Sequence, residues 1–290
     1  MTWVDGLLID IDGVLSVSWE AIDGAPGALA ELRARQVPLR FATNTTTRTR
    51  AEVASLLTGA GMPVDPDEIL TAPVATAAHL RRHHPEARCY LLNSGDLSED
   101  LEGIDVVSGD AAGPVDVVVV GGAGLNFTHT ELNRAFGHLL DGATFVAMHR
   151  NLYWRTSAGM ELDTGAYVAA LEESSGMIPV VLGKPSPEFF ATGVAELGLF
   201  PDRVAMVGDD VDNDVLAGQR CGLRGVLVQT GKFRPEALDM ASGTPDHVVD
   251  SFADVPALLE HCPAPLGRWV RRRRPARRAE TSGSCGLRRR

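Results

Sequence analysis

Two groups of aspartates follow short apolar runs, and both could take part in metal or proton-transfer chemistry. Asp10 and Asp12 come directly after the apolar residues 4–9, and Asp209 follows the apolar residues 204–207 after one glycine. In open parallel sheets, ligands bind at the carboxyl ends of the strands, where two acidic ends can face each other. Carboxylates that converge repel one another unless they take up protons or bind a hard divalent cation. The two acidic strand ends together therefore favour a Mg²⁺ site.

Groups that could bind phosphate stand at two further points of the chain. Thr43 and Asn44 follow the apolar residues 37–42, and a hydroxyl with free backbone N–H groups suits phosphate oxygens there. Lys184 lies before a Ser-Pro pair that is typical of a helix start. It is one of only two lysines in the chain, and a lysine ammonium can bridge a phosphoryl group and a carboxylate.

Each of these features also has a simpler structural interpretation. An isolated D-x-D is more often an acidic loop than a site, and a Thr-Asn pair before a helix is more often a cap. Asp210 and Asp214 could only be stabilising a helix N-terminus. A single lysine is usually a surface residue. The structural interpretation does not account for Asp10 and Asp209 together at the ends of two buried strands.

The elements that would position these residues alternate between strand and helix. The apolar pattern predicts strands and helices in the following segments. Strands are expected at 4–9, 37–42, 115–120, 144–148, 178–182, 204–207 and 225–228, and helices at 24–36, 130–140, 164–173, 187–198 and 211–220. A further helix should begin at Thr49, where Thr-Arg-Ala-Glu matches a capping box. Such alternation is typical of an α/β fold with a doubly wound parallel sheet covered on both faces.

The order of the motifs resembles a known family. The chain carries Asp10-Ile11-Asp12-Gly13, then Thr43-Asn44, then Gly183-Lys184-Pro185, then Gly208-Asp209-Asp210 with Asp214 behind it. This order resembles the four-motif signature of the haloacid dehalogenase-like (HAD) hydrolase superfamily. The resemblance covers residues 4 to about 260 and implies a Rossmann-like core.

Spacing indicates the subgroup. Only 30 residues separate Asp12 from Thr43, whereas 140 separate Thr43 from Lys184, and a stretch of that length needs structure of its own. The pattern is similar to the NagD-like subfamily IIA, which has a large cap between the second and third motifs. The residues within the motifs are most similar to those of the haloacid dehalogenase-like hydrolase domain-containing protein 2 branch. The resemblance implies a core at residues 1–72 and 182–262 and an inserted α/β cap at 73–181.

The resemblance also implies a mechanism. Asp10 would be the nucleophile that forms an aspartyl-phosphate, and Asp12 would be the general acid and base. Mg²⁺ would be held by the carboxylates of Asp10 and Asp209 and by the backbone carbonyl of Asp12. The function implied is a Mg²⁺-dependent phosphatase that acts on a small phosphate monoester.

The remaining site residues follow from the same resemblance. The phosphoryl group would be bound by Thr43, Lys184 and the backbone N–H of Asn44. Asp214 would orient Lys184, and Asp210 would support the metal through water. His149 and Asn151 lie in the segment that corresponds to the substrate loop of the cap, although an ordinary surface loop is an equally good interpretation.

Three other functions remain open from the sequence. The same intermediate could pass its phosphoryl group to an acceptor other than water, which would make the protein a phosphotransferase. A non-catalytic binding protein could retain the fold. A metal-dependent glycosyltransferase could use D-x-D, although it would not need Thr43, Lys184 and Asp209.

Charge is distributed unevenly along the chain. The formal charge is −11, but residues 268–290 contain ten Arg and one Glu, and the first 267 residues carry −20. The acidic body argues against nucleic-acid binding by the folded part. We expect the tail from 263 to 290 to be disordered, because it offers almost nothing to bury.

The composition also bears on compartment and assembly. No apolar run is long enough to span a membrane, and the first residues lack the pattern of a secretory signal. The four cysteines form no C-x-x-C pair, so we expect a reducing, cytoplasmic location. Capped relatives commonly pair through the cap, so a homodimer through this unit is possible.

Overall fold

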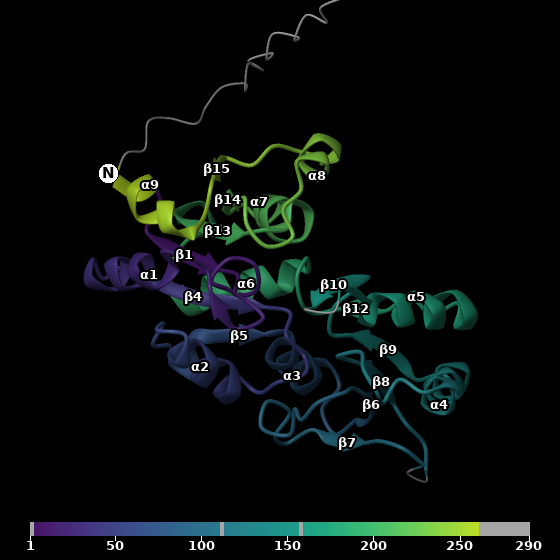
Figure 1. Cartoon of the computed structure of the whole chain (residues 1–290). Helices are drawn as coiled ribbons and strands as arrows, with labels where there is room; N and C mark the ends of the chain where they lie inside the picture. The colour runs from purple at the N-terminus through teal and green to yellow at the C-terminus, as the bar shows by residue number, and fades with distance from the viewer. Residues whose placement is uncertain (1–2, 111–112, 157–158, 261–290) are drawn as a thin grey trace, which may run out of the picture.

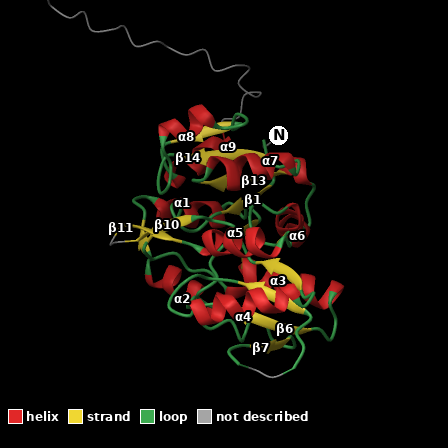
Figure 2. Cartoon of the chain, turned by 90° about the vertical axis from the view of Figure 1, so that its right-hand side faces the viewer, coloured by secondary structure: helices red, strands yellow, loops and turns green. Residues whose placement is uncertain are grey.

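The computed structural model describes residues 3–110, 113–156 and 159–260. In these residues the chain forms two parallel β-sheets, each with helices packed against it (Figure 1). Figure 2 shows that the two sheets lie in separate layered units, with β14 near one end of the molecule and β7 near the other. The α/β architecture expected from the sequence is therefore confirmed.

The first sheet, which we call the core sheet, has the strand order β15-β14-β13-β1-β4-β5, and all its strands are parallel. Its strands are β1 (Gly6–Ile9), β4 (Leu39–Thr43), β5 (Ile69–Thr71), β13 (Val204–Gly208), β14 (Arg224–Val228) and β15 (His247–Val249). On β1, Ile9 lies opposite Val207 of β13 and Phe41 of β4. The residues that follow these three strands therefore leave the sheet side by side, at one edge.

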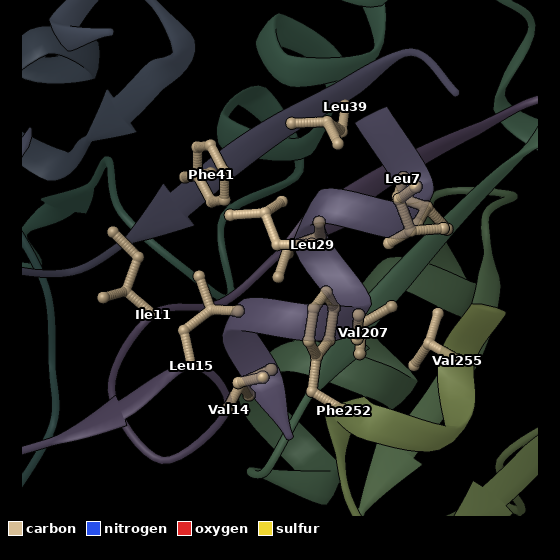
Figure 3. Packing of buried hydrophobic residues seen from close by; sticks show 14 of the residues in the cluster. Leu7, Ile11, Val14, Leu15, Leu29, Leu39, Phe41, Val207, Phe252 and Val255 are labelled. Atoms are coloured by element: carbon tan, nitrogen blue, oxygen red, sulfur yellow. The ribbon is translucent and has the colours of Figure 1, made fainter. Parts of the chain in front are cut away.

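Helices cover both faces of the core sheet because its strands are apolar on both sides. They are α1 (Ala25–Ala34), α2 (Arg50–Gly59), α6 (Pro187–Leu197), α7 (Ala217–Arg220), α8 (Pro235–Met240) and α9 (Val255–Glu260). Leu7 packs with Leu29 of α1 and Val255 of α9 on one face (Figure 3). Leu8, the next residue of β1, packs with Phe190 of α6 on the other face. This alternation is what a strand buried on both sides requires.

The second sheet, the cap sheet, has the order β12-β9-β8-β6-β7 and is also parallel. Its strands are β6 (Arg88–Leu92), β7 (Asp105–Val107), β8 (Val117–Val120), β9 (Thr144–Ala147) and β12 (Val180–Val181). Helices α4 (His129–Leu140) and α5 (Thr164–Ser175) pack on one face, and α3 (Ala72–His83) contributes Leu80 to the other. The division expected at residues 72 and 182 falls between the two sheets and stays a prediction.

Two small antiparallel hairpins accompany the sheets. They are β2 (Ser16–Val17) with β3 (Glu20–Ala21), and β10 (Tyr153–Thr156) with β11 (Gly159–Leu162). Short 3₁₀ turns lie at Pro66–Glu68, Pro201–Arg203 and Phe252–Asp254, and a π-helical turn, η3, spans Val211–Leu216. The first hairpin follows the Asp10–Gly13 segment, and the second follows β9 of the cap sheet.

The structure corrects several sequence-based boundaries. The strand expected at 178–182 is only Val180–Val181, and the helix expected at 211–220 begins as a π-helical turn before α7. Strands β5, β6, β7 and β15 were not predicted, because three of them are three residues long and β6 begins with an arginine. The capping box at Thr49 is confirmed: its side chain accepts from the Glu52 N–H and Glu52 accepts from the Thr49 N–H.

The structure also bears on two expectations drawn from composition. No helix among the described residues is long and apolar enough to cross a membrane. Cys89 and Cys221 are free thiols. The tail at 263–290, which the sequence predicts to be disordered, lies outside the described residues.

Candidate active site

Three buried aspartates converge at the carboxyl edge of the core sheet. Asp10 follows β1, Asp209 follows β13, and Asp214 lies on η3. Each offers one carboxylate oxygen, and these three oxygens lie within 4.8 Å of one another. The Oδ1 atom of Asp209 is buried and has no hydrogen-bond partner among the described residues. A hard cation that prefers oxygen ligands, such as Mg²⁺, fits this set of donors.

Burial and nearby charges change the proton affinities of Asp209 and Asp214. Burial and the charge of Asp10 raise the pKa of Asp209 to about 7. Burial also raises the pKa of Asp214 well above its usual range, even though the nearby Lys184 acts in the opposite direction. A cation bound beside Asp209 would favour its charged form. The sequence assigned the metal to Asp10, Asp209 and the Asp12 backbone; in the structure the third clustered carboxylate is Asp214.

Lys184 is the buried cation of the site. Its ammonium nitrogen lies 2.7 Å from Oδ1 of Asp10 and 2.8 Å from Oδ1 of Asp214. Burial alone would lower the pKa of Lys184, but the two carboxylates outweigh this effect and raise it. The Lys184 side chain therefore stays charged beside Asp10. This agrees with the expectation that Asp214 is its partner.

Asn44 holds the backbone of Lys184 from the neighbouring strand end. The Asn44 side chain donates to the Lys184 carbonyl at 2.9 Å and accepts from the Lys184 N–H at 2.8 Å. Thr43 is buried beside it, and its hydroxyl accepts from the Thr45 N–H at 3.1 Å. The sequence predicted a phosphate-binding N–H at Asn44, but it gave no indication that the side chain fastens Lys184.

Asp12 stands apart from the carboxylate cluster and remains accessible from the site. Desolvation of its carboxyl group and the charge of Asp10 raise its pKa above the usual value, while Lys232 and Lys184 act in the opposite direction. Two residues away, the Asp10 carboxylate accepts from the Ile11 N–H at 2.8 Å. Asp10 and Asp12 thus experience different surroundings, which two carboxylates need if they are to serve different purposes.

A loop after β14 closes around Asp209. The Lys232 N–H donates to Oδ2 of Asp209 at 2.6 Å, and the Thr230 hydroxyl donates to the Gly13 carbonyl at 2.5 Å. Gly13 and Gly231 both have positive φ, at 86° and 60°. A Cβ atom on either glycine would lie within 2.1 Å of Asp209 Oδ2. The close approach of these two backbones therefore requires glycine on both sides.

Asp210 performs a structural task at the start of η3. Its side chain accepts from the N–H groups of Asp212 and Asn213 at 3.2 and 3.0 Å, and from the Asn213 side chain at 2.9 Å. The helix-capping interpretation therefore accounts for its contacts among the described residues. Asp210 also borders the site cavity described next.

A cavity of about 220 Å³, the site cavity, opens between the core sheet and the cap sheet. Its floor includes Asp10, Asp12, Thr43 and Lys184, and its cap side includes His149 and Asn151 together with Gly122, Ala123 and Asp163. Both residues expected in the cap substrate loop thus lie at the cavity. A second cavity, the side cavity of about 610 Å³, adjoins it along Asn151, Asp210, Asn213 and Lys232.

His149 is the buried cap residue of the site cavity. Its Nδ1 atom accepts from the Asn151 N–H at 3.3 Å, which places the ring proton on Nε2. Nε2 faces the Thr46 hydroxyl of the core at 3.4 Å and the Asp163 carboxylate at 3.9 Å. Burial lowers the pKa of His149. The neutral ring therefore joins the cap to the core rather than adding a charge.

Sequence reasoning missed several residues of the site cavity. Lys232 is the most prominent, and its signal was present: it is the second of only two lysines and follows a parallel strand. Trp19 and Arg48 also line the cavity, with the Arg48 guanidinium 5.6 Å from the Trp19 ring centre. Trp19 lies at the tip of the β2–β3 hairpin, where Ser18 and Trp19 both have positive φ.

Comparisons with known proteins agree with this geometry. The family model described as haloacid dehalogenase-like hydrolase matches residues 7–107, and a second HAD-hydrolase-like model matches residues 181–255. The human phospholysine phosphohistidine inorganic pyrophosphate phosphatase is 34% identical over 265 residues, which cover 89% of this chain and 95% of that protein. The chain belongs to the haloacid dehalogenase-like hydrolase family.

Other relatives identify the subgroup. Haloacid dehalogenase-like hydrolase domain-containing protein 2 of Bos taurus is 35% identical over 88% of this chain and 96% of its own length. The p-nitrophenyl phosphatase of Archaeoglobus fulgidus is 30% identical, with a TM-score of 0.81 over 88% of this chain and 99% of its own. NagD of E. coli K-12 is 28% identical, with a TM-score of 0.77 over 88% of this chain and 98% of its own. This HAD hydrolase belongs to subfamily IIA, as the motif spacing predicted.

Membership also decides between the classes that the sequence left open. Two of these relatives, which cover 88–89% of this chain, are named phosphatases, so it is an enzyme of the HAD phosphatase class. This excludes the glycosyltransferase interpretation and argues against the non-catalytic binding protein.

Proposed function

We propose that this HAD hydrolase is a Mg²⁺-dependent phosphatase that cleaves a small phosphate monoester through an aspartyl-phosphate on Asp10. The observation that carries the proposal is the setting of Asp10. One of its carboxylate oxygens is 2.7 Å from the Lys184 ammonium, and Asp209 belongs to the same cluster. The buried Oδ1 of Asp209 has no hydrogen-bond partner among the described residues. Phosphoryl transfer needs chiefly positioning and cancellation of charge, and this arrangement offers both.

We propose the carboxylates of Asp10 and Asp209 and the backbone carbonyl of Asp12 as the protein ligands of Mg²⁺. When bound, the ion would neutralise negative charge on the phosphoryl oxygens. Asp214 then serves Lys184 rather than the metal, because both of its oxygens have partners: Oδ1 lies 2.8 Å from the ammonium and Oδ2 accepts from the Asp210 N–H at 3.4 Å. Asp210 would support the site through the start of η3, which its side chain caps.

The proposed reaction has two displacements at phosphorus. In the first, an oxygen of Asp10 bonds to phosphorus while the bond from phosphorus to the leaving oxygen breaks, and Asp12 gives that oxygen its proton. In the second, Asp12 takes a proton from water as the water oxygen attacks, and Asp10 leaves as a carboxylate. Lys184, the Thr43 hydroxyl and the Asn44 N–H would bind the transferring group throughout.

The relatives suggest which substrates to examine first. Their names mention phospholysine, phosphohistidine, inorganic pyrophosphate and p-nitrophenyl phosphate, which are all small phosphoryl compounds. A site cavity of about 220 Å³ suits substrates of this size. A phosphotransferase would share every residue of the first displacement and differ only in the acceptor of the second.

A substrate screen with and without Mg²⁺ tests the proposal. The full chain should release inorganic phosphate from 4-nitrophenyl phosphate with Mg²⁺, and removal of the metal by a chelator should abolish release. Addition of alcohols as competing acceptors, with product analysis, separates hydrolysis from phosphotransfer. Absence of phosphate release from all the substrates above, with Mg²⁺ bound, would refute the proposal.

Substitution of the two leading aspartates tests the mechanism. Asp10→Asn removes the nucleophile and should abolish turnover, by at least about a thousandfold. Asp12→Asn keeps the nucleophile but removes the acid and base, so the phosphorylated protein should accumulate with an activated aryl phosphate and appear by intact mass. Near wild-type turnover in Asp10→Asn would exclude Asp10 as the nucleophile.

Two further properties remain proposals from the sequence. We place the enzyme in the cytoplasm, and we regard a homodimer through the cap as its possible assembly. Gel filtration with light scattering would determine the second.

A further inference from the structure

Both lysines of the chain lie at the site cavity, but they have different partners. Lys184 is paired with Asp10 and Asp214, whereas the Lys232 ammonium has no carboxylate within 4.0 Å among the described residues. The backbone of Lys232 is held by Asp209, so the residue is fixed in place although its charged end is free. The aspartates of the site act on Lys232 only at longer range, and no carboxylate of the described residues forms a salt bridge with it. A fixed, partly buried cation in this position offers a site for an anion that comes from outside the protein.

The surroundings of Lys232 place this anion on the leaving-group side of the substrate. The transferring phosphoryl group must lie at Asp10, where Lys184 already supplies a cation. The charges that act on Lys232 are those of four aspartates, in decreasing order Asp209, Asp10, Asp214 and Asp12. Lys232 in turn acts on Asp12, which would protonate the leaving oxygen, and on His149 of the cap. It also borders both the site cavity and the side cavity, along the path by which a leaving group would extend.

Arg48 provides a second unpaired cation in the same cavity. No salt bridge joins it to a described carboxylate, and its guanidinium packs over Trp19 of the β2–β3 hairpin. A neutral leaving group in this small cavity would displace water from both cations and offer no negative charge in return. Its binding would therefore be disfavoured.

We propose that Lys232 binds a second anionic group, a carboxylate or a phosphate, on the leaving group of the substrate. This inference rests on the phosphatase function proposed above and adds the class of substrate: phosphate esters or anhydrides whose leaving group is itself negatively charged. Lys232 is then a specificity-determining residue, and Arg48 adds positive charge to the same cavity.

Competitive inhibition measures this preference without requiring that every compound be turned over. The full chain is assayed with 4-nitrophenyl phosphate at a fixed concentration of free Mg²⁺, and inhibition constants are obtained for three competitors. Ethyl phosphate has an uncharged leaving group, 2-phosphoglycolate has nearly the same size with a carboxylate, and pyrophosphate carries a phosphate. The last two distinguish the two sources of negative charge.

The wild type should bind 2-phosphoglycolate, pyrophosphate or both at least about tenfold more tightly than ethyl phosphate, as a charge-assisted hydrogen bond would give. Lys232→Met should remove this preference while changing the constant for ethyl phosphate less than about threefold. Lys232→Arg should restore most of the preference. Arg220→Met, which removes an exposed charge outside both cavities, should leave it intact.

Three results would overturn the inference. The wild type could show no preference for charged leaving groups, Lys232→Met could weaken all three competitors equally, or Arg220→Met could have the same effect as Lys232→Met. An equal loss with a shifted pH–rate profile would mean that Lys232 acts only on Asp12. Failure of the phosphatase proposal itself would be distinct, because 4-nitrophenyl phosphate would then not be hydrolysed at all.

Discussion

At the scale of single residues, Lys184 shows how a charged side chain is kept in a buried position. Removal of an ammonium from water is costly unless anions and hydrogen bonds replace the water. Asp10 and Asp214 both lie within 2.8 Å of it, and Asn44 binds its backbone N–H and carbonyl. Asn44 therefore fixes the backbone of Lys184, and the two aspartates stabilise its charge. Together they keep the ammonium beside Asp10 before any substrate binds.

His149 should make the stability of the protein depend on pH. Because burial lowers its pKa below the ordinary value of 6.5, the folded protein binds this proton less readily than the unfolded chain. As the pH falls below about 6.5, the unfolded chain gains a proton that the folded protein lacks, so the free energy of unfolding decreases, by up to about 1.4 kcal/mol per pH unit. Above that pH the contribution is constant.

His149→Gln removes this titration. The difference in unfolding free energy between wild type and variant should therefore change in favour of the variant as the pH is lowered from 7.5 to 5, in urea denaturation. Asp163, at 3.9 Å, and Lys232 are the charged groups that also act on the ring, with opposite effects on its pKa. Parallel stability curves for the two proteins would show that His149 is protonated equally in both states.

At the scale of elements, the site depends on loops that leave adjacent strands and then touch. The Asp10–Gly13 segment follows β1, the Asp209 segment follows the neighbouring β13, and the Gly231 loop follows β14 on the far side. Gly231 and Gly13 approach so closely that a Cβ atom on Gly231 would lie 2.4 Å from the Cα atom of Gly13. The position of Asp209 is thus set by contacts between loops and not by its strand alone.

Gly231→Ala should disrupt the proposed metal site. Its new methyl group would lie 2.1 Å from Asp209 Oδ2, so the carboxylate must move. We expect a 10- to 100-fold rise in the Mg²⁺ concentration needed for half-maximal activity, roughly the effect of a disturbed supporting residue. Gly198→Ala is a matched control, because Gly198 also has positive φ, 66° against 60°, but its Cβ would meet nothing within 4 Å. Equal loss in both variants would assign the effect to backbone strain.

At the scale of the whole molecule, the site cavity exists only where core and cap meet. The Arg50 side chain, at the start of α2, donates to Asp100 beside the cap sheet at 2.9 Å, and the Asp100 side chain is fully buried. His149 and Thr46 meet across the same boundary. The Arg50–Asp100 ion pair and the His149–Thr46 contact therefore both hold the cap in position on the core.

Loss of this ion pair from one side should destabilise the protein. Arg50→Met leaves the Asp100 carboxylate buried without its charged partner, and we expect a loss of roughly 2–4 kcal/mol in the free energy of unfolding. Asp100→Leu in the same protein should recover much of it, because the unpaired charge is then gone. Urea denaturation of the wild type, both single variants and the double variant measures this coupling. Additive effects would mean that the two side chains do not depend on each other.

The amino-acid sequence by itself predicted which residues would carry the chemistry and where the cap would be inserted. Asp10, Thr43 and Asp209 stood out because each follows an apolar run that predicts a buried strand, and parallel strands end at a common edge. Lys184 stood out because it is one of two lysines and lies before a Ser-Pro helix start. The unequal spacings around Thr43, together with the family resemblance, predicted an inserted cap. These properties are local or depend on order along the chain, so a single sequence contains them.

Only the tertiary structure decided which side chains meet. The bonds from Asn44 to Lys184 join residues 140 positions apart, and His149 lies 103 positions from Thr46. The rarity of lysine marked Lys232 in the sequence, but only the structure shows that its ammonium has no carboxylate within 4.0 Å among the described residues. Contacts of this kind depend on how two sheets and their loops pack, and periodicity and spacing contain no information about that packing.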